Sequence, residues 1–175
     1  MPGRAVFLDK DGTLVENVPY NVALDRVRLV DGARQALAEM RSAGYELIVA
    51  SNQSGVARGL CSEQDVRRVA RYLGSLLATA GTPLGGFYFC PHLRCAGRKP
   101  APGMLHQAAI DHRLDLRSCW FVGDILDDVE AGSRAGCRTI LVDNGGETEW
   151  RRGPFREPAA VVPDLRAAAR VIACS

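Results

Sequence analysis

Hydrophobic positions along the chain form short continuous runs that alternate with segments of helical spacing. The runs predict strands at residues 6–8, 45–50, 86–90, 119–122, 138–142 and 160–162. Apolar residues three or four positions apart predict helices at residues 31–44, 62–81, 103–112, 128–135 and 164–173. Because parallel strands are joined by helical crossovers and are buried on both faces, this alternation predicts an α/β fold with a doubly wound parallel sheet.

Polar residues and glycines mark where several of these helices begin and end. Asp31 is a predicted N-cap, and Ser62 with Asp65 forms a variant of the capping box. Gly44 and Gly81 follow the last apolar position of their helices, where glycine readily takes the left-handed conformation.

Residues 15–29 have no regular period and include Asn17, Pro19 and Tyr20. Loops of this length in a compact domain are usually lids or binding loops, so we expect a flap here. No other insertion is long enough for a separate cap domain. At 175 residues the chain is predicted to be one domain, residues 1–175.

Composition and charge limit the classes of molecule that the protein is expected to bind. The chain is 47% hydrophobic and 24% charged, as in ordinary soluble globular proteins. Its formal net charge of +2 comes with scattered basic residues, which argues against a nucleic-acid-binding protein. There is no apolar run of membrane-spanning length and no signal-peptide stretch at the N-terminus. We therefore expect a cytoplasmic monomer that acts on a small molecule, without nucleic-acid or membrane partners.

Six cysteines stand at positions 61, 90, 95, 119, 137 and 174. In a cytosolic chain of this length, free buried thiols are more common than disulfides. Cys90 and Cys95 are close enough in sequence to raise the question of a metal site.

Two aspartates follow the first predicted strand directly, Asp9 and Asp11, and Gly12 comes next. Residues two apart on a strand point to the same side, so both carboxylates can project from the carboxyl end, where open α/β sheets bind ligands. Close carboxylates repel each other unless a proton or a cation lies between them, and Mg²⁺ prefers oxygen ligands. Asp-Gly is also a common turn signal. This segment alone leaves a metal site and a plain turn open.

Three later segments place further polar chemistry near predicted strand ends. Residues 51–55 (SNQSG) offer a hydroxyl and backbone N–H groups to an anion. Residues 98–99 (RK) can meet phosphate groups through a guanidinium fork and a point charge. Asp124 is a candidate Mg²⁺ ligand, with Asp127 and Asp128 in capping or supporting roles. Taken singly, a plain turn and a solvated basic loop are the simpler interpretations of the first two.

In this order the four motifs resemble those of the haloacid dehalogenase-like (HAD) phosphatases. The closer pattern is similar to the histidinol-phosphate and heptose-bisphosphate phosphatase group, and is carried by residues 7–13, 51–59, 90–92, 98–100 and 102–104. The resemblance covers residues 4–146. It implies a Rossmann-like, HAD-type fold without a separate cap domain, and a phosphomonoester hydrolase.

The resemblance also implies a role for each motif residue. Asp9 is expected to be the nucleophile that forms an aspartyl-phosphate, and Asp11 the general acid and base. Mg²⁺ is expected to bind Asp9, the backbone carbonyl of Asp11, and Asp124. Ser51 and Lys99 are expected to stabilise the phosphoryl oxygens.

The substrate implied by the resemblance is D-glycero-D-manno-heptose 1,7-bisphosphate, which would lose its 7-phosphate. The expected substrate-binding residues are Asn17, Tyr20, Asn52, Gln53, Ser54 and Arg98, the last on the second phosphate. Histidinol phosphate is the alternative substrate, because that activity shares nearly all these residues. A catalytically silent phosphosugar-binding protein is the alternative from another class. A pure binder would not need Asp11 as an acid, which argues against it.

The chain departs from the group's pattern at two places. Members often carry a structural zinc in the loop before residue 98, where this chain offers Cys90, His92 and Cys95 as candidate ligands but has Gly97 in place of a fourth cysteine. Structural zinc takes four ligands, so we expect no tightly bound zinc. Ile125 replaces a lysine that usually follows the fourth-motif aspartate, which puts the preferred substrate in doubt.

Overall fold

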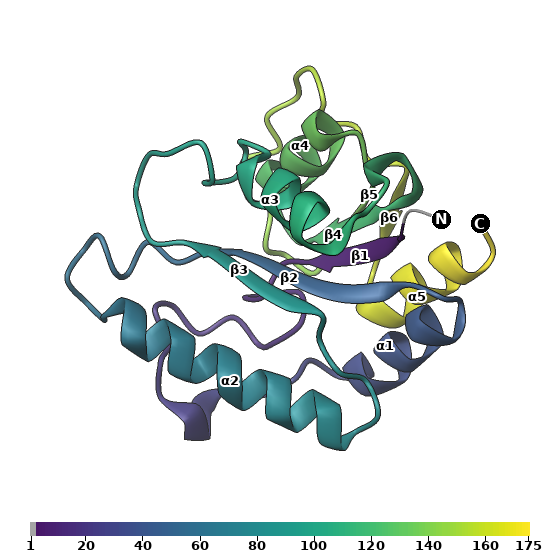
Figure 1. The fold of residues 1–175 in the computed structure, drawn as a ribbon. Coiled ribbons are helices and arrows are strands. Elements are labelled where there is room, and N and C mark those ends of the chain that lie inside the picture. The colour runs from purple at the N-terminus through teal and green to yellow at the C-terminus, as the bar shows by residue number, and fades with distance from the viewer. Residues whose placement is uncertain (1–2) are drawn as a thin grey trace.

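A computed structural model describes residues 3–175. Its six named strands form a single parallel sheet in the order β3-β2-β1-β4-β5-β6 (Figure 1). The strands are β1 (Ala5–Leu8), β2 (Glu46–Asn52), β3 (Gly86–Cys90), β4 (Trp120–Gly123), β5 (Arg138–Val142) and β6 (Ala160–Val162). The predicted doubly wound parallel α/β fold is therefore confirmed.

Helices cover both faces of the sheet. In Figure 1, α1 (Ala33–Ser42), α2 (Glu63–Thr79) and α5 (Leu165–Ala173) lie on one side, and α3 (Gly103–His112) and α4 (Leu126–Ala135) lie on the other. Two short 3₁₀ helices complete the fold, η1 (Leu24–Arg26) and η2 (Leu116–Ser118). The chain leaves β1 in opposite directions, first toward β2 and β3 and later toward β4, so the carboxyl end of β1 lies at the switch point where such sheets bind ligands.

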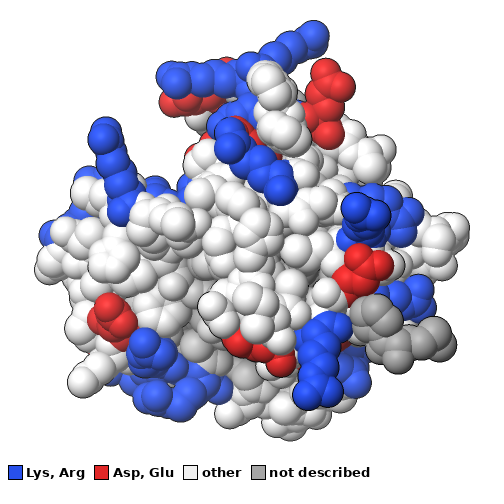
Figure 2. All heavy atoms as spheres, turned by 45° about the horizontal axis from the view of Figure 1, so that its top comes forward, with Lys and Arg blue, Asp and Glu red and all other residues white. Residues whose placement is uncertain are grey.

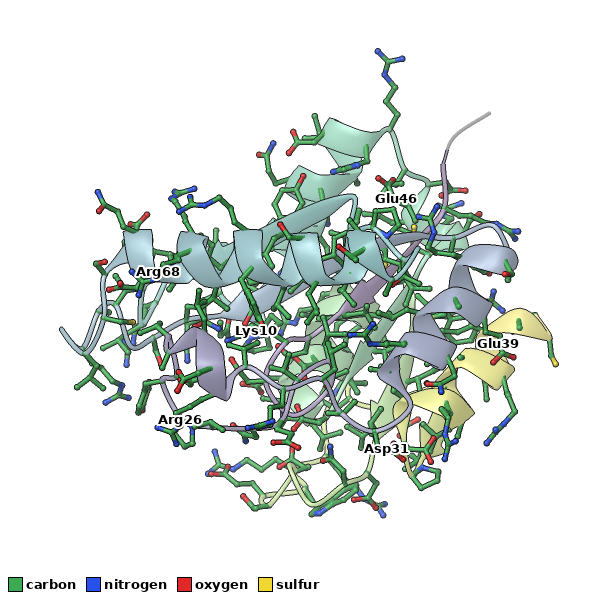
Figure 3. All side chains as sticks on the ribbon, turned by 90° about the horizontal axis from the view of Figure 1, so that it is seen from below. Lys10, Arg26, Asp31, Glu39, Glu46 and Arg68 are labelled. Atoms are coloured by element: carbon green, nitrogen blue, oxygen red, sulfur yellow. The ribbon has the colours of Figure 1, made fainter. Side chains whose placement is uncertain are left out.

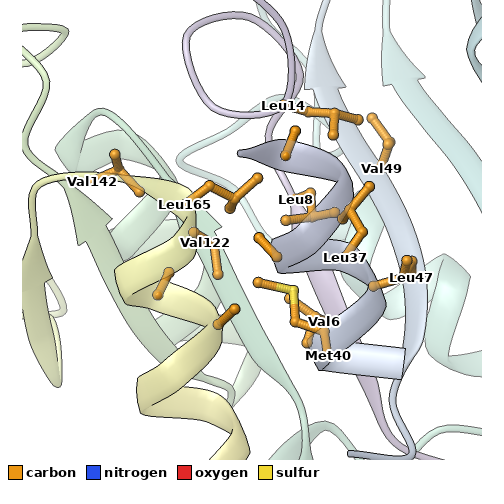
Figure 4. Packing of buried hydrophobic residues seen from close by; sticks show 14 of the residues in the cluster. Val6, Leu8, Leu14, Leu37, Met40, Leu47, Val49, Val122, Val142 and Leu165 are labelled. Carbon is orange, nitrogen blue, oxygen red and sulfur yellow. The ribbon is translucent and has the colours of Figure 1, made fainter. Parts of the chain in front are cut away.

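The central strand β1 contributes to a core on each face. Val6 and Leu8 pack against α1 and α5, in the cluster that Figure 4 shows from close by. Phe7 points the other way, and its ring meets Phe121 edge to face with the centroids 6.4 Å apart. Burial on both faces explains why the strand is a continuous apolar run rather than an alternating one.

The first residues of the helices can be compared with the caps that the sequence predicted. Ser62 accepts a hydrogen bond from the Asp65 backbone N–H and the Asp65 side chain accepts one from the Ser62 N–H, which confirms the predicted capping box of α2. The prediction that Asp31 is the N-cap of α1 was wrong. The N-cap of α1 is Gly32, with a φ of 71° and no side-chain cap, and the Asp31 side chain is fully exposed. Helix α4 begins at Leu126, two residues earlier than predicted.

The flap is anchored at its base. The Glu16 N–H donates to the Arg28 carbonyl at 2.9 Å, and the Val30 N–H donates to the Leu14 carbonyl at 3.1 Å. Leu14 is fully buried in the core, whereas Tyr20 farther along the flap is 47% exposed. The flap therefore has a rigid base and a solvent-facing tip above the carboxyl end of β1.

On the face that Figure 2 shows, acidic and basic side chains are interspersed, so neither charge covers the face alone. Across residues 3–175, every helix is too short or too polar to pass through a bilayer. The six cysteines are free thiols; Cys90, Cys119 and Cys137 are buried, whereas Cys95 and Cys174 are exposed.

Candidate active site

The ends of three neighbouring strands bring polar side chains together. Asp9 directly follows β1, and Asp124 directly follows β4. Ser51 is the second-to-last residue of β2. All three side chains are buried, and the Asp9 N–H donates to the Val122 carbonyl at 2.9 Å, which extends the β1–β4 pairing to the catalytic edge. The structure thus assembles residues that are more than a hundred positions apart in sequence.

Lys99 reaches the same point from the loop that precedes α3. Its Nζ lies 2.5 Å from Asp9 Oδ1 and 2.6 Å from Asp128 Oδ1, and the side chain is 2% exposed. Burial acts to lower the pKa of Lys99, but the carboxylates of Asp128 and Asp9 outweigh it and raise that pKa above its usual value. Lys99 is therefore an ammonium at neutral pH and lies between two carboxylates.

Three buried carboxylates converge beside this ammonium. Oxygens of Asp9, Asp124 and Asp128 lie within 4.8 Å of one another. Burial, reinforced by the neighbouring carboxylates, raises the pKa of Asp124 to about 8. Burial likewise raises the pKa of Asp128 to about 7, although Lys99 opposes the rise. One ammonium cannot neutralise three carboxylates, so the cluster favours an additional cation.

Two glycines keep space open around the Asp124 carboxylate. A Cβ at Gly12 would lie 2.1 Å from Asp124 Oδ2, and one at Gly146 would lie 2.2 Å from the same oxygen. Hard carboxylate oxygens in a partly neutralised cluster are the donor set that Mg²⁺ takes. The residues present therefore fit a magnesium ion.

Asp11 has a different environment from Asp9. Its Oδ1 lies 2.8 Å from Lys10 Nζ, its Oδ2 accepts a hydrogen bond of 3.0 Å from Gln53 Nε2, and its side chain is 30% exposed. Burial raises the pKa of Asp11, Lys10 lowers it, and the neighbouring charge of Asp9 raises it again, with a net rise. Figure 3 shows Lys10 in the interior of the molecule, and only 3% of the residue is exposed. A carboxyl group with a raised pKa is suited to carry a proton.

Gln53 links two of the predicted site residues. Its Nε2 donates to Asp11 Oδ2 and also to Ser51 Oγ, the latter at 2.8 Å. Because Ser51 Oγ accepts this bond, its own hydroxyl hydrogen is left to donate to another acceptor. The position of Gln53 therefore supports the chemistry as well as lining the site.

Asn52 holds the loop that carries Lys99. Its Nδ2 donates to the Lys99 carbonyl and its Oδ1 accepts from the Lys99 N–H, both at 3.0 Å. The side-chain amide is thus committed to the protein backbone, although Asn52 still lines the hollow above Asp9.

The remaining predicted residues surround this centre. A hollow of about 180 Å³ is lined by Asp9, Asp11, Asn17, Asn52, Lys99, Asp124, Ile125 and Gly146. A neighbouring hollow of about 170 Å³ adds Tyr20, Gln53 and Ser54. Residues of the flap therefore line the same hollows as the carboxylates.

Arg98 and Lys99 line a third hollow. The hollow has a volume of about 390 Å³, and its lining includes Arg94, Arg98 and Arg134, with Lys99 common to this hollow and the one that Asp9 lines. One guanidinium nitrogen of Arg98 donates to the His92 carbonyl at 3.3 Å. The charged residues of the hollow that Arg98 lines are mostly basic, with Asp127 as the acidic one.

The three candidate zinc ligands do not all meet at one point. Two of them do interact, since burial and the neighbouring Cys95 thiol both raise the pKa of Cys90. Cys90 is buried, whereas His92 and Cys95 are exposed. Across residues 3–175, the one group of three or more acidic, histidine or cysteine side chains with converging ligand atoms is the Asp9, Asp124 and Asp128 cluster. The loop thus lacks the four-ligand tetrahedron that structural zinc requires.

Sequence reasoning missed two parts of the site. Asp128 was expected to cap a helix or support the site, and its Oδ2 does accept from the N–H of Ile125, the N-cap of α4, at 3.3 Å. The sequence did not predict that the same carboxylate is also a member of the central cluster. The loop after β5 was not connected with the site at all. Its Asn144 donates to the Gly12 carbonyl at 2.6 Å, and its Glu147 Oε2 accepts from the Leu126 N–H at 2.7 Å. No local motif signals these contacts, because each spans at least 21 residues.

Comparison with known proteins places this geometry in a family. A family model described as HAD-hydrolase-like matches residues 96–168. A D-glycero-beta-D-manno-heptose-1,7-bisphosphate 7-phosphatase from Pasteurella multocida is 38% identical over 152 residues, which cover 81% of this chain and 83% of that one. A D-glycero-D-manno-heptose-1,7-bisphosphate 7-phosphatase from Thermosynechococcus vestitus is 40% identical, with 96% of this chain and 94% of that chain covered.

A solved structure agrees with these sequence relatives. The D,D-heptose 1,7-bisphosphate phosphatase from B. bronchiseptica, in complex with magnesium and phosphate, matches with a TM-score of 0.79 and 31% identity over 97% of each chain. Fold and relatives together define the class, a HAD-like hydrolase that is a phosphatase. Within that class the chain belongs to the heptose-1,7-bisphosphate 7-phosphatase family. The resemblance predicted from the sequence is confirmed.

Proposed function

We propose that this phosphatase removes the 7-phosphate of D-glycero-D-manno-heptose 1,7-bisphosphate through an aspartyl-phosphate on Asp9, with Mg²⁺ as cofactor. The observation that carries the proposal is the contrast between two neighbouring carboxylates. Asp9 is buried against Lys99 in the carboxylate cluster, whereas Asp11 is partly exposed and its pKa is raised. The first environment suits an ionised nucleophile and the second suits a proton donor.

In this mechanism Asp9, Asp124 and the backbone carbonyl of Asp11 would hold Mg²⁺, which offsets the repulsion between an anionic nucleophile and an anionic phosphate. A carboxylate oxygen of Asp9 attacks the phosphorus, and the bond from phosphorus to the sugar oxygen breaks. Asp11 donates its proton to that departing oxygen. Lys99 and the Ser51 hydroxyl stabilise the charge on the phosphoryl oxygens.

The second half of the reaction restores the enzyme. Asp11, now ionised, accepts a proton from a water molecule, whose oxygen attacks the phosphorus of the aspartyl-phosphate. The bond between phosphorus and the Asp9 oxygen breaks, inorganic phosphate leaves, and Asp11 is protonated again. Acid and base are thus one residue, which requires a carboxyl group that water can reach, and Asp11 retains 30% side-chain exposure.

The substrate part of the proposal rests on the three hollows around Asp9 and Lys99. The sugar would lie against Asn17, Tyr20, Asn52, Gln53 and Ser54, beside the carboxylates. The second phosphate would meet Arg98 in the basic hollow, which Lys99 connects to the cluster. Ile125 lines the hollow above Asp9 and supplies no charge, so the second phosphate depends on the arginines.

The mechanism is tested by Asp9→Asn. We expect Mg²⁺-dependent phosphate release to fall to background, because an amide cannot form the aspartyl-phosphate. The matched control is Asp31→Asn, the same change at a fully exposed aspartate, which should keep wild-type activity. Persistent Mg²⁺-dependent release by Asp9→Asn would overturn the covalent mechanism, and no release by the wild type would indicate a silent binding protein.

The substrate is tested by phosphate release from the heptose bisphosphate, from sugar monophosphates and from histidinol phosphate. We expect the bisphosphate to give the highest kcat/KM. Arg98→Ala should lower that value about tenfold to hundredfold, because a charge-assisted hydrogen bond contributes about 1.5–3 kcal/mol. Arg170→Ala on the exposed side of α5 is the control. Equal kcat/KM values for bisphosphate and monophosphate would overturn the role of Arg98, and a preference for histidinol phosphate would overturn the substrate.

A further inference from the structure

The loop between β5 and β6 also contacts the site. Its first residues turn back over the carboxyl end of β1, and the Asn144 Nδ2 donates to the Gly12 carbonyl at 2.6 Å. The Asn144 Oδ1 accepts from the Gly146 N–H at 3.1 Å, so one side chain fixes both the loop and the turn after Asp11.

Gly146 is the point of closest approach to the carboxylate cluster. A Cβ there would lie 2.2 Å from Asp124 Oδ2, and a Cβ at Gly12 would lie 2.1 Å from the same oxygen. This Asp124 oxygen is therefore enclosed between two backbone segments that Asn144 ties together. The φ of Gly146 is not in the left-handed region, so space rather than backbone conformation requires glycine there.

Glu147 anchors the same segment to helix α4. Its Oε2 accepts from the Leu126 N–H at 2.7 Å, and its Oε1 accepts from the N–H groups of Glu149 and Trp150 at 2.8 and 3.2 Å. Leu126 is the first residue of α4, and Asp128 lies in the first turn of that helix. One carboxylate thus joins the loop to the helix that presents a second member of the cluster.

We propose that residues 144–147 form a clamp that holds the Asp124 carboxylate in its metal-binding position, with Glu147 as the positioning residue that secures the clamp to α4. The proposal rests on the proposed function, since it concerns the magnesium ion of that site. Groups that orient metal ligands through hydrogen bonds typically contribute about tenfold to hundredfold in metal affinity.

Two matched pairs of variants in this loop test the clamp. Gly146→Ala places a methyl group against Asp124, whereas Gly153→Ala adds one where the nearest atom is 3.8 Å away. Glu147→Gln replaces one acceptor oxygen with an N–H₂ group, whereas Glu149→Gln alters an exposed side chain that pairs only with Arg151 among residues 3–175. Each pair makes the same chemical change at a clamp position and at a neighbouring position.

The readout is the Kd for Mg²⁺, measured by titration calorimetry with MgCl₂ on the full chain without substrate, with the melting temperature of the metal-free protein recorded beside it. We expect Gly146→Ala and Glu147→Gln to raise the Kd about tenfold, and their partners to leave it within twofold. A merely structural role would lower the melting temperature and leave the Kd unchanged, and that result would overturn the clamp.

The failure of the clamp and of the proposed function can be told apart. If the wild type binds Mg²⁺ and all four variants bind it equally well, the clamp is wrong and the proposed function stands. If the clamp variants bind Mg²⁺ weakly while Asp9→Asn keeps phosphatase activity, the clamp stands and the covalent mechanism is wrong. A wild type that binds no Mg²⁺ overturns both.

Discussion

The role expected of Gln53 changes most once its hydrogen bonds are known. The sequence placed it among the groups that contact the sugar, and it does line the hollow beside the flap. Its amide nitrogen, however, is committed to Asp11 and Ser51. Orientation of an acid and of a phosphate ligand is a different contribution from binding, and kinetics separate the two because they act on kcat and KM respectively.

Replacement of Gln53 by leucine measures that contribution. We expect Gln53→Leu to lower kcat about hundredfold, because small misplacements of a catalytic group have effects of this size, while KM stays within a few-fold of wild type. Steady-state phosphate release gives both constants. Gln107→Leu, at an exposed glutamine of α3, is the control. A raised KM with an unchanged kcat would return Gln53 to a substrate-binding role.

At the scale of the elements, most features that depend on residues close in sequence were predicted, with the N-cap of α1 as the exception, since Gly32 and not Asp31 takes that position. The strands and the α2 capping box depend on residues close in sequence, such as Ser62 and Asp65, and both were predicted. The start of α4 was misplaced because its first N–H is bound by Glu147, 21 residues farther along. The motif residues Asp9, Ser51 and Asp124 lie together because parallel strands end at one edge, a rule that sequence order is enough to apply. Lys99 reaches them from the loop before α3.

The capping box also gives a stability prediction that is independent of catalysis. Ser62→Ala should lower the free energy of unfolding by about 1 kcal/mol, because it removes the acceptor of the Asp65 N–H at the start of α2. Urea unfolding measures the change. Ser75→Ala, at an exposed position inside the same helix, should not destabilise the protein. A drop in specific activity of folded Ser62→Ala protein would show that α2 influences the site, contrary to this expectation.

At the scale of the whole molecule, the buried carboxylates make stability depend on pH and on metal. Aspartates in an unfolded chain ionise near pH 4, whereas the folded protein raises the pKa of Asp124 to about 8 and that of Asp128 to about 7. The folded state therefore binds more protons than the unfolded chain between these limits. The corresponding stabilisation is fully present below about pH 4 and is lost as pH rises to about 8.

We accordingly expect the melting temperature of the protein in EDTA to fall between pH 5 and pH 8, beyond any change caused by other groups. Asp124→Asn should make this fall shallower, because an amide does not ionise. Saturating Mg²⁺ should oppose the fall in the wild type, since the ion binds the ionised carboxylates. Identical pH dependences for wild type and Asp124→Asn in EDTA would contradict the assignment.

The central position of β1 has a consequence for synthesis on the ribosome. Leu8 pairs with Val49 on one side and with Val122 on the other, so the strand that carries Asp9 has a single neighbour until β4 has emerged. At roughly 5–20 residues per second, the stretch from Gln53 to Asp124 takes about 4–14 s to translate. For that time an apolar strand edge stays open to chaperones and to other nascent chains. The proposed site is thus completed only when β4 and Asp124 have been made, long after Asp9 and Asp11.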